Sequence, residues 1–93
     1  MLMKWEGVTK EHYETMRKTV QWEPDVPKGA VFHVAAFTDT GCRVTDIWES
    51  AEDLNNFVQN RLMPGAIAAN VPGQPEVEVY PAHAIFVPAL QKL

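Results

Sequence analysis

The sequence predicts an α+β sandwich, in which a four-stranded antiparallel sheet carries both of its helices on one face. Two strand-like runs, residues 30–38 and 42–49, are separated by only three residues, which indicates a β-hairpin. A helix start at Ser50 follows the hairpin directly. A strand and a helix precede this unit and a strand follows it, so the expected order of elements is β-α-β-β-α-β.

The first half of the chain predicts one strand and one helix. Residues 2–6 form the expected first strand, and Thr9 is the expected N-cap of the helix, with Glu11 close to the positive end of the helix dipole. The apolar stripe of this helix consists of Tyr13, Met16 and Val20. Two prolines and a glycine in residues 21–29 predict an irregular connection to the next strand.

The second half predicts a capped helix and a long final strand. Ser50 is the expected N-cap, with Asp53 at the acidic position of a capping box. The buried stripe of the helix consists of Leu54, Phe57, Val58 and Leu62. Pro64 and Gly65 should kink or end it. Residues 76–87 are expected to form the last strand, because they open with regular alternation of Glu and Val.

This order of elements restricts the topology strongly. Right-handed crossovers through the two helices place the first and third strands in the centre of the sheet, which gives a ferredoxin-like sandwich. Residues 1–93 are expected to form this single domain, since chains this short rarely hold two cores. The helices leave one face of the sheet uncovered. A second copy of the chain is the simplest cover, and we therefore expect a homodimer.

Composition excludes several classes of protein. The net charge is −4 and the basic residues form no run, so nucleic-acid binding is not expected. Cys42 is the only cysteine, which excludes an internal disulfide and fits a reducing cytosol. The first residues lack the apolar region of a signal peptide, and the apolar runs are too short to span a bilayer. The sequence thus predicts a cytoplasmic protein without a membrane partner.

The end of the hairpin carries a family resemblance. The run Asp46-Ile-Trp48-Glu49-Ser50 and the helix opening Ala51-Glu-Asp-Leu54 resemble the dimeric α+β barrel superfamily, and within it the antibiotic biosynthesis monooxygenase-like proteins. The resemblance covers the element order of nearly the whole chain and the motifs of residues 30–62. It implies a homodimer whose open sheets meet face to face, with a cavity or a packed core between them.

The same resemblance leaves the activity open. Members of the superfamily include cofactor-independent oxygenases, haem-degrading enzymes, other small-molecule enzymes and proteins of unknown role. Oxygenase members place an Asn on the first strand, which is absent here, and many relatives carry a His at about the position of Phe57. The resemblance therefore implies a cofactor-independent oxygenase or a related enzyme, if the protein is an enzyme at all, and no cofactor is expected.

The register of the hairpin decides which polar residues share a face. A three-residue turn with Gly41 in the left-handed region pairs His33 with Ile47, and it directs His33, Arg43 and Thr45 to the open face. Asp46 and Trp48 then lie under the helices. A two-residue Thr40-Gly41 turn would instead place His33 opposite Trp48, with Asp46 on the same face. The first register is favoured, and the second remains an alternative.

The candidate chemistry rests on a few polar side chains. His33 and His83 are candidate general bases or polar anchors, because imidazole titrates near neutral pH. Asp46 has apolar neighbours, and a buried carboxylate must be paired, either with a histidine that it orients or with Arg43 or Arg61. The candidate catalytic residues are therefore His33, His83 and Asp46. The candidate ligand-binding residues are Arg43, Thr45, Trp48 and Tyr80, with Arg43 suited to an anionic group. No metal site is expected, since the histidines show no close ligand spacing such as H-x-H or H-x-x-x-H.

Two functions of different classes fit these observations. The first is a homodimeric protein that holds a small hydrophobic or aromatic ligand in a cavity on the open face of each sheet. The second is a non-catalytic dimeric binding or assembly module, in which side chains fill the barrel interior. A pocket of several hundred Å³ with convergent polar groups would favour the first function.

Overall fold

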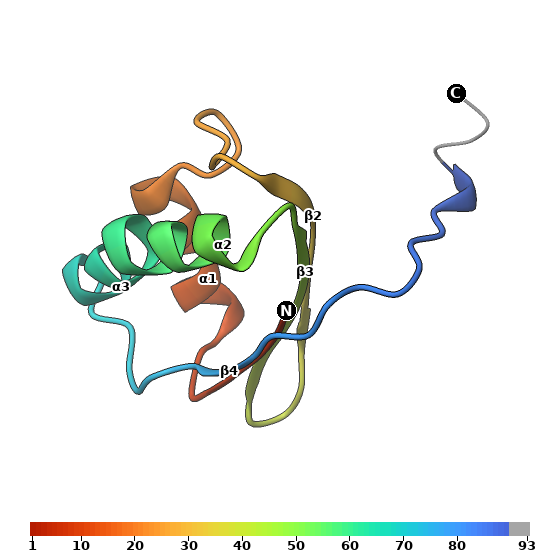
Figure 1. Ribbon diagram of the computed structural model, residues 1–93. Coiled ribbons are helices and arrows are strands. Elements are labelled where there is room, and N and C mark those ends of the chain that lie inside the picture. The colour runs from red at the N-terminus through yellow and green to blue at the C-terminus, as the bar shows by residue number, and fades with distance from the viewer. Residues whose placement is uncertain (90–93) are drawn as a thin grey trace.

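The computed structural model describes residues 1–89 as a small α+β protein (Figure 1). The helices of residues 10–20 and 51–68 lie on one face of a four-stranded antiparallel sheet. The elements are β1 (Leu2–Glu6), α1 (Lys10–Val20), β2 (Ala30–Phe37), β3 (Gly41–Trp48), α2 (Ala51–Phe57), the π-helical segment η1 (Val58–Leu62), α3 (Met63–Ala68) and β4 (Glu76–Glu78). The strand order is β2-β3-β1-β4, so the first and third strands are central, as right-handed crossovers predict.

Helix α1 begins at the predicted cap. The hydroxyl of Thr9 accepts a hydrogen bond from the backbone N–H of His12 (3.2 Å), and Nδ1 of His12 accepts one from the backbone N–H of Thr9 (3.0 Å). This is a capping box in which His12 takes the place of the usual Glu or Gln. The helix ends at Gln21, which adopts the left-handed conformation (φ 58°).

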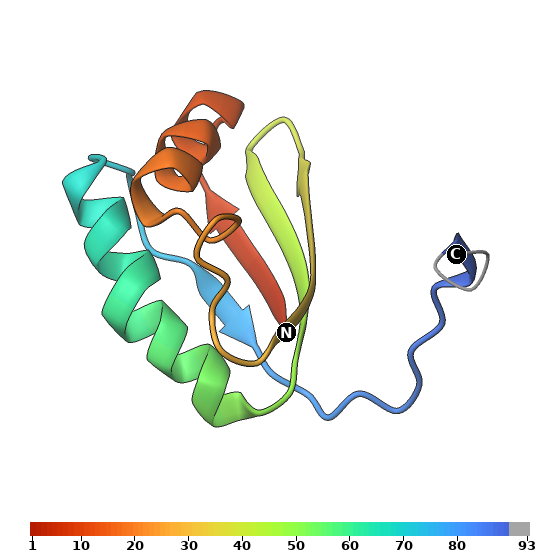
Figure 2. The same cartoon turned by 90° about the horizontal axis from the view of Figure 1, so that it is seen from above.

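The second helix also starts where predicted but continues further. Ser50 accepts a hydrogen bond from the backbone N–H of Asp53 (3.1 Å). The segments α2, η1 and α3 follow one another as a continuous helix to Ala68 (Figure 2). Of the two predicted outcomes at Pro64-Gly65, a kink or an end, the end is therefore wrong. The wider i→i+5 hydrogen bonding of η1, immediately before Pro64, takes up the discontinuity that a proline introduces.

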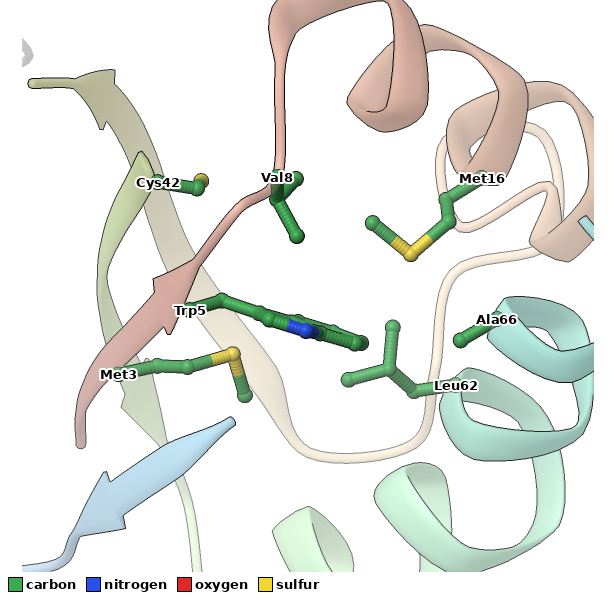
Figure 3. Close-up of a cluster of buried hydrophobic side chains, with 7 residues drawn as sticks. All are labelled: Met3, Trp5, Val8, Met16, Cys42, Leu62 and Ala66. Atoms are coloured by element: carbon green, nitrogen blue, oxygen red, sulfur yellow. The ribbon is translucent and has the colours of Figure 1, made fainter. Parts of the chain in front are cut away.

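A buried cluster joins the sheet to the helices. Figure 3 shows the indole of Trp5 projecting from β1 towards Leu62 and Ala66 of the second helix. The members of the cluster are Met3, Trp5, Val8, Met16, Cys42, Leu62 and Ala66. The indole N–H of Trp5 is not left unpaired, because it donates to the backbone oxygen of Pro72 (2.9 Å).

The hairpin register differs from both predicted registers. The structure pairs Phe37 with Cys42, and the turn consists of Asp39 and Thr40 alone. The backbone N–H of Thr38 donates to the carbonyl oxygen of Gly41 (2.8 Å). The hydroxyl of Thr38 also accepts from the backbone N–H groups of Thr40 and Gly41 (3.2 Å each), and so closes the turn.

The position of Gly41 explains why the hairpin register was predicted wrongly. It lies in strand β3 opposite Glu6 rather than in a left-handed turn. A Cβ atom added at Gly41 would overlap the backbone oxygen of Trp5 in the neighbouring strand. The close approach of β1 therefore requires glycine at this position. The prediction had instead attributed Gly41 to a left-handed turn.

The observed register turns His33 to the opposite face from the one favoured by the sequence. His33 pairs directly with Asp46, on the face that the helices cover. Arg43 and Thr45 do lie on the open face, as predicted. The other β2 and β3 side chains on that face are Phe32, Val34, Ala36 and Ile47.

The last strand is much shorter than predicted. Strand β4 holds only Glu76–Glu78 and pairs with residues 2–4 of β1. Glu78 pairs with Leu2, the first residue of β1, so the residues after Glu78 have no further β1 residue to pair with. Pro81, in addition, has no N–H to donate to a strand pairing. Residues 79–89, here called the C-terminal arm, run away from the body of the molecule (Figures 1 and 2).

Candidate functional site

A chain of three polar side chains links the sheet to helix α1. Nδ1 of His33 on β2 lies 2.6 Å from a carboxylate oxygen of Asp46, its cross-strand partner on β3. Nε2 of the same ring lies 2.8 Å from the hydroxyl of Tyr13, which projects from α1. Asp46, His33 and Tyr13 therefore form a hydrogen-bonded relay that crosses from the sheet to the helix layer.

Asp46 is the buried end of this relay, with 8% of its surface exposed. Its second carboxylate oxygen accepts a hydrogen bond from the indole N–H of Trp48 (3.0 Å). Both oxygens are thus paired, which is what allows a carboxylate to lie among apolar neighbours. A carboxylate accepts hydrogen bonds, so the contact with Asp46 favours the His33 tautomer that carries its hydrogen on Nδ1 and leaves Nε2 able to accept.

Tyr13 is the donor at the other end. Burial raises the pKa of Tyr13 to about 12, so its hydroxyl stays protonated at neutral pH. Aromatic rings surround it, with Trp22 at 5.5 Å and Phe37 at 5.8 Å between ring centroids. These contacts hold the phenol ring against β2, and the hydroxyl donates to Nε2 of His33.

The relay borders a cavity between the sheet and the helices. The cavity has a volume of about 350 Å³, which is within the range of small-molecule sites. Its walls are mostly apolar and aromatic, while His33, Asp46 and Tyr13 supply polar atoms to one side. The side chains of Trp5, Trp22 and Trp48, the three tryptophans of the chain, all line it.

A second hollow lies outside the relay and has a different character. This outer groove, of about 560 Å³, is lined by charged residues of α1 and by the edge of β2. Arg17 contributes its guanidinium, which forms ion pairs with Glu14 and Glu23. Tyr13 and His33 line both the groove and the cavity. The side chain of His33 is 37% exposed, and it lies between the polar outer groove and the apolar cavity.

The other predicted site residues lie elsewhere. Arg43, on the open face, binds the carboxylate of Glu6 (2.7 Å) and does not contact Asp46, and Thr45 is exposed on the same face. Tyr80 and His83 belong to the C-terminal arm, where the hydroxyl of Tyr80 donates to Glu78 (3.2 Å). The structure thus joins His33, Asp46 and Trp48 but does not bring His83 to them.

Two residues of the site were not recognised in the sequence. Tyr13 was assigned to the apolar stripe of its helix, and Trp22 lies in the predicted irregular connection of residues 21–29, where no site residue was expected. Both do pack against the core, and both also line the cavity. A buried tyrosine hydroxyl needs a hydrogen-bond partner, and this requirement was the available signal that Tyr13 meets a polar side chain.

Arg61, the other candidate partner of Asp46, has a different role. Its guanidinium donates to the backbone oxygen of Val20 (3.0 Å) at the end of helix α1, and it lies 5.4 Å from the centre of the Phe57 ring. It therefore ties the two helices together. Phe57 in turn packs on Trp48, with 5.4 Å between the ring centroids.

Comparison with protein-family models, with curated proteins and with solved structures gave no match. Within residues 1–89, no three His, Cys, Asp or Glu side chains are grouped so that they could hold a metal ion. No helix in this part of the chain is both long enough and apolar enough to cross a membrane. The site is therefore interpreted from its own geometry.

Proposed function

We propose that this protein binds a small aromatic molecule with an ionisable hydroxyl, a phenol or an enol, in the cavity beside Trp48 and removes the hydroxyl proton through His33. The observation that carries the proposal is the Asp46–His33–Tyr13 relay at the border of an apolar cavity of about 350 Å³. A base oriented by a carboxylate and facing an apolar pocket is the arrangement that general-base catalysis requires.

The proton transfer proceeds along the hydrogen bonds in order. The ligand O–H bond breaks as its proton passes to the hydroxyl oxygen of Tyr13, while the proton of Tyr13 passes to Nε2 of His33. The products are a ligand anion and an imidazolium, and the carboxylate of Asp46 stabilises the imidazolium. Tyr13 is neutral before and after the step, in keeping with its raised pKa.

The resemblance to antibiotic biosynthesis monooxygenase-like proteins suggests that the ionised ligand then reacts with O₂. In a cofactor-independent oxygenation of a phenol, O₂ would place one oxygen atom on the ring as a quinone carbonyl and release the other as water. The ionised phenol is the reactive form in such a step. Under this proposal the relay supplies that form, and the apolar walls keep bulk water away from it.

Fold and assembly belong to the same proposal. The strand order β2-β3-β1-β4 and the two helical crossovers support a ferredoxin-like sandwich. Exposed apolar side chains on the open face, among them Leu2, Phe32 and Val34, support a homodimer that covers this face. The dimer would leave the cavity on the helix side of each protomer open to ligands.

Tryptophan fluorescence tests ligand binding, because every tryptophan of the chain lines the cavity. A hydroxynaphthoquinone should quench the emission saturably, and oxygen uptake with a naphthol should be measured on the same protein. His33→Gln should keep quinone binding within a few-fold and lose about 10²-fold or more of the oxygen uptake. His12→Gln is the matched control, because glutamine can keep the capping box of α1.

The outcomes separate the candidate functions. Saturable quenching with no oxygen uptake in the wild-type protein would leave a non-catalytic binding module. Equal oxygen uptake by the wild-type protein and His33→Gln would remove His33 from the mechanism. Absence of saturable quenching by any of the phenols and quinones would contradict the ligand site itself.

A further inference from the structure

The segment that joins α1 to β2 forms one wall of the cavity. This connecting loop, residues 21–29, lines the cavity with four side chains, which are Trp22, Glu23, Val26 and Pro27. Within residues 1–89, every other lining residue belongs to a strand or a helix, except Val8, which is 2% exposed. The connecting loop is therefore the part of the wall that can move without breaking the hydrogen bonds of a strand or a helix.

Trp22 and Glu23 lie between the cavity and the outer groove, because both side chains line the two hollows. The indole ring of Trp22 packs on both rings of the relay, with 5.5 Å to Tyr13 and 5.8 Å to His33 between ring centroids. Tyr13 and His33 also line both hollows, but they belong to α1 and β2. Movement of Trp22 alone would therefore join the groove to the cavity and leave the relay in place.

An ion pair holds the middle of the connecting loop. The backbone holds its two ends: Gln21 donates its N–H to the carbonyl oxygen of Arg17 (3.1 Å). At the other end, the carbonyl oxygen of Gly29 accepts from the N–H of Glu49 (2.8 Å). Between them, the carboxylate of Glu23 binds both Nε and Nη2 of Arg17, with 2.9 Å to Nη2. The two side chains are 45% and 54% exposed, so water and salt weaken this pair and it can break and form again.

We propose that the ligand enters the cavity from the outer groove, past Trp22, and that the ion pair between Arg17 and Glu23 is the latch that keeps this entrance closed. When the pair breaks, the connecting loop carries Trp22 away from the relay while both ends of the loop stay fixed. When it forms again, Trp22 returns to the relay and excludes water from the bound ligand. The proposal rests on the ligand site proposed above.

The two partners of Arg17 provide a matched pair of variants. Glu14 also forms an ion pair with Arg17 (3.3 Å), but it lies on α1, so its removal does not release the connecting loop. Glu23→Gln and Glu14→Gln change the charge of the groove by the same amount. Only Glu23→Gln weakens the attachment of the loop. Asp25, the other acidic residue of the loop, is 81% exposed and 3.7 Å from its partner, so it is a weaker attachment.

The rates of ligand binding test the latch. Stopped-flow quenching of the tryptophan emission by a hydroxynaphthoquinone gives the association and dissociation rate constants. In Glu23→Gln both should rise about 3-fold, while Kd stays within about 2-fold, because the latch closes the entrance in the free and the bound protein alike. Glu14→Gln should keep the wild-type rates. Added NaCl should raise both rates in the wild-type protein more than in Glu23→Gln.

The movement of Trp22 has a readout that needs no ligand. Incorporation of 5-fluorotryptophan gives one fluorine signal for each of the three tryptophans, and Trp22→Phe identifies the signal of Trp22. In Glu23→Gln this signal should shift towards its position in urea, or a second signal should appear there, because the indole leaves the relay rings more often. The signals of the other two tryptophans should not change, and Glu14→Gln should match the wild-type protein.

The outcomes separate the latch from the ligand site. Normal quenching with unchanged rates in Glu23→Gln would overturn the latch and leave the ligand site intact. Equal changes in Glu23→Gln and Glu14→Gln would also overturn it, because the effect would then come from the charge of the groove. A change in the dissociation rate alone would show that Glu23 contacts the ligand and does not control entry. Absence of quenching in the wild-type protein would overturn the ligand site, and the entrance with it.

Discussion

In the proposed mechanism, the Tyr13 hydroxyl must give its proton only when His33 can accept one. Burial against Trp22 and Phe37 raises its pKa to about 12 from an ordinary value of 10.0. A free tyrosinate is therefore disfavoured throughout the physiological range. In the proposed mechanism the hydroxyl passes on its proton and regains one from the ligand in the same step.

Titration of the phenol absorbance tests this property. The chain has two tyrosines, so Tyr80→Phe leaves Tyr13 as the single reporter. We expect its ionisation midpoint near pH 12 in the folded protein and near 10 after unfolding in urea. A midpoint near 10 in the folded protein would show that Tyr13 is solvated and free of the relay.

The same shift predicts a dependence of stability on pH. Because the folded-state pKa of Tyr13 is the higher one, its neutral form contributes to stability fully below pH 10, and the contribution is lost as the pH rises through about 12. The free energy of unfolding of the wild-type protein in urea should therefore fall over that interval more than that of Tyr13→Phe. Parallel losses in the two proteins would contradict the assignment.

Cys42 should behave as an inert thiol. It is 2% exposed in the core cluster, and burial raises the pKa of its thiol. A thiol reagent reaches such a group only when the fold opens. We expect labelling at neutral pH to be about 100-fold or more slower in the native protein than in urea. Comparable rates would mean that β3 is not packed against the helices as described.

Asp46 shows how much of the environment of a single residue could be predicted from the sequence. The sequence correctly indicated that this carboxylate must be paired, because its neighbours in the strand are apolar. It could not choose among His33, Arg43 and Arg61, since the choice depends on which residue of β2 lies opposite. The partner of a buried charge is a property of strand register rather than of composition.

At the scale of elements, the packing of α1 against α3 is set by Gly65. A Cβ atom at this position would overlap a methyl group of Val20, which is itself buried. The absence of a side chain lets the two helices approach closely at this point. Gly65 thus has a packing role. The sequence analysis had considered it only together with Pro64, as a possible kink or end of the helix.

Gly65→Ala should destabilise the protein by about 1–3 kcal/mol, because the core must shift to admit the new methyl group. In a Val20→Ala background the overlapping methyl is gone, and the same substitution should cost about 1 kcal/mol less. Urea unfolding of the four proteins of this cycle measures the coupling. Equal costs in the two backgrounds would show that Gly65 and Val20 do not meet.

The hairpin shows the limit of sequence reasoning for elements. Both strands and the cap at Ser50 were predicted within one residue, because alternation and capping are local signals. The register was wrong because Gly41 is constrained by Trp5 of another strand, and the hydroxyl of Thr38 closes the turn instead. The last strand was also predicted to be too long, since its end depends on where β1 begins.

At the scale of the whole molecule, the two faces of the sheet have different properties. The helix side holds the core, the cavity and the relay, while the open side and the arm expose apolar groups. If the ligand binds on the helix side and a dimer forms through the open side, the dimer can form without closing the ligand site. The sequence indicated that a face was uncovered, but it assigned the candidate cavity to that face, because His33 was placed there.

The absorbance of a bound naphthol tests the central claim most directly, because the ionised and neutral forms of the ligand have different spectra. At a pH well below the ligand's own pKa, binding to the wild-type protein should produce the naphtholate band, and binding to His33→Gln should not. His12→Gln should match the wild-type protein. A bound ligand that stays neutral in the wild-type protein, or that ionises equally in His33→Gln, would contradict the proposal that the Asp46–His33–Tyr13 relay accepts its proton.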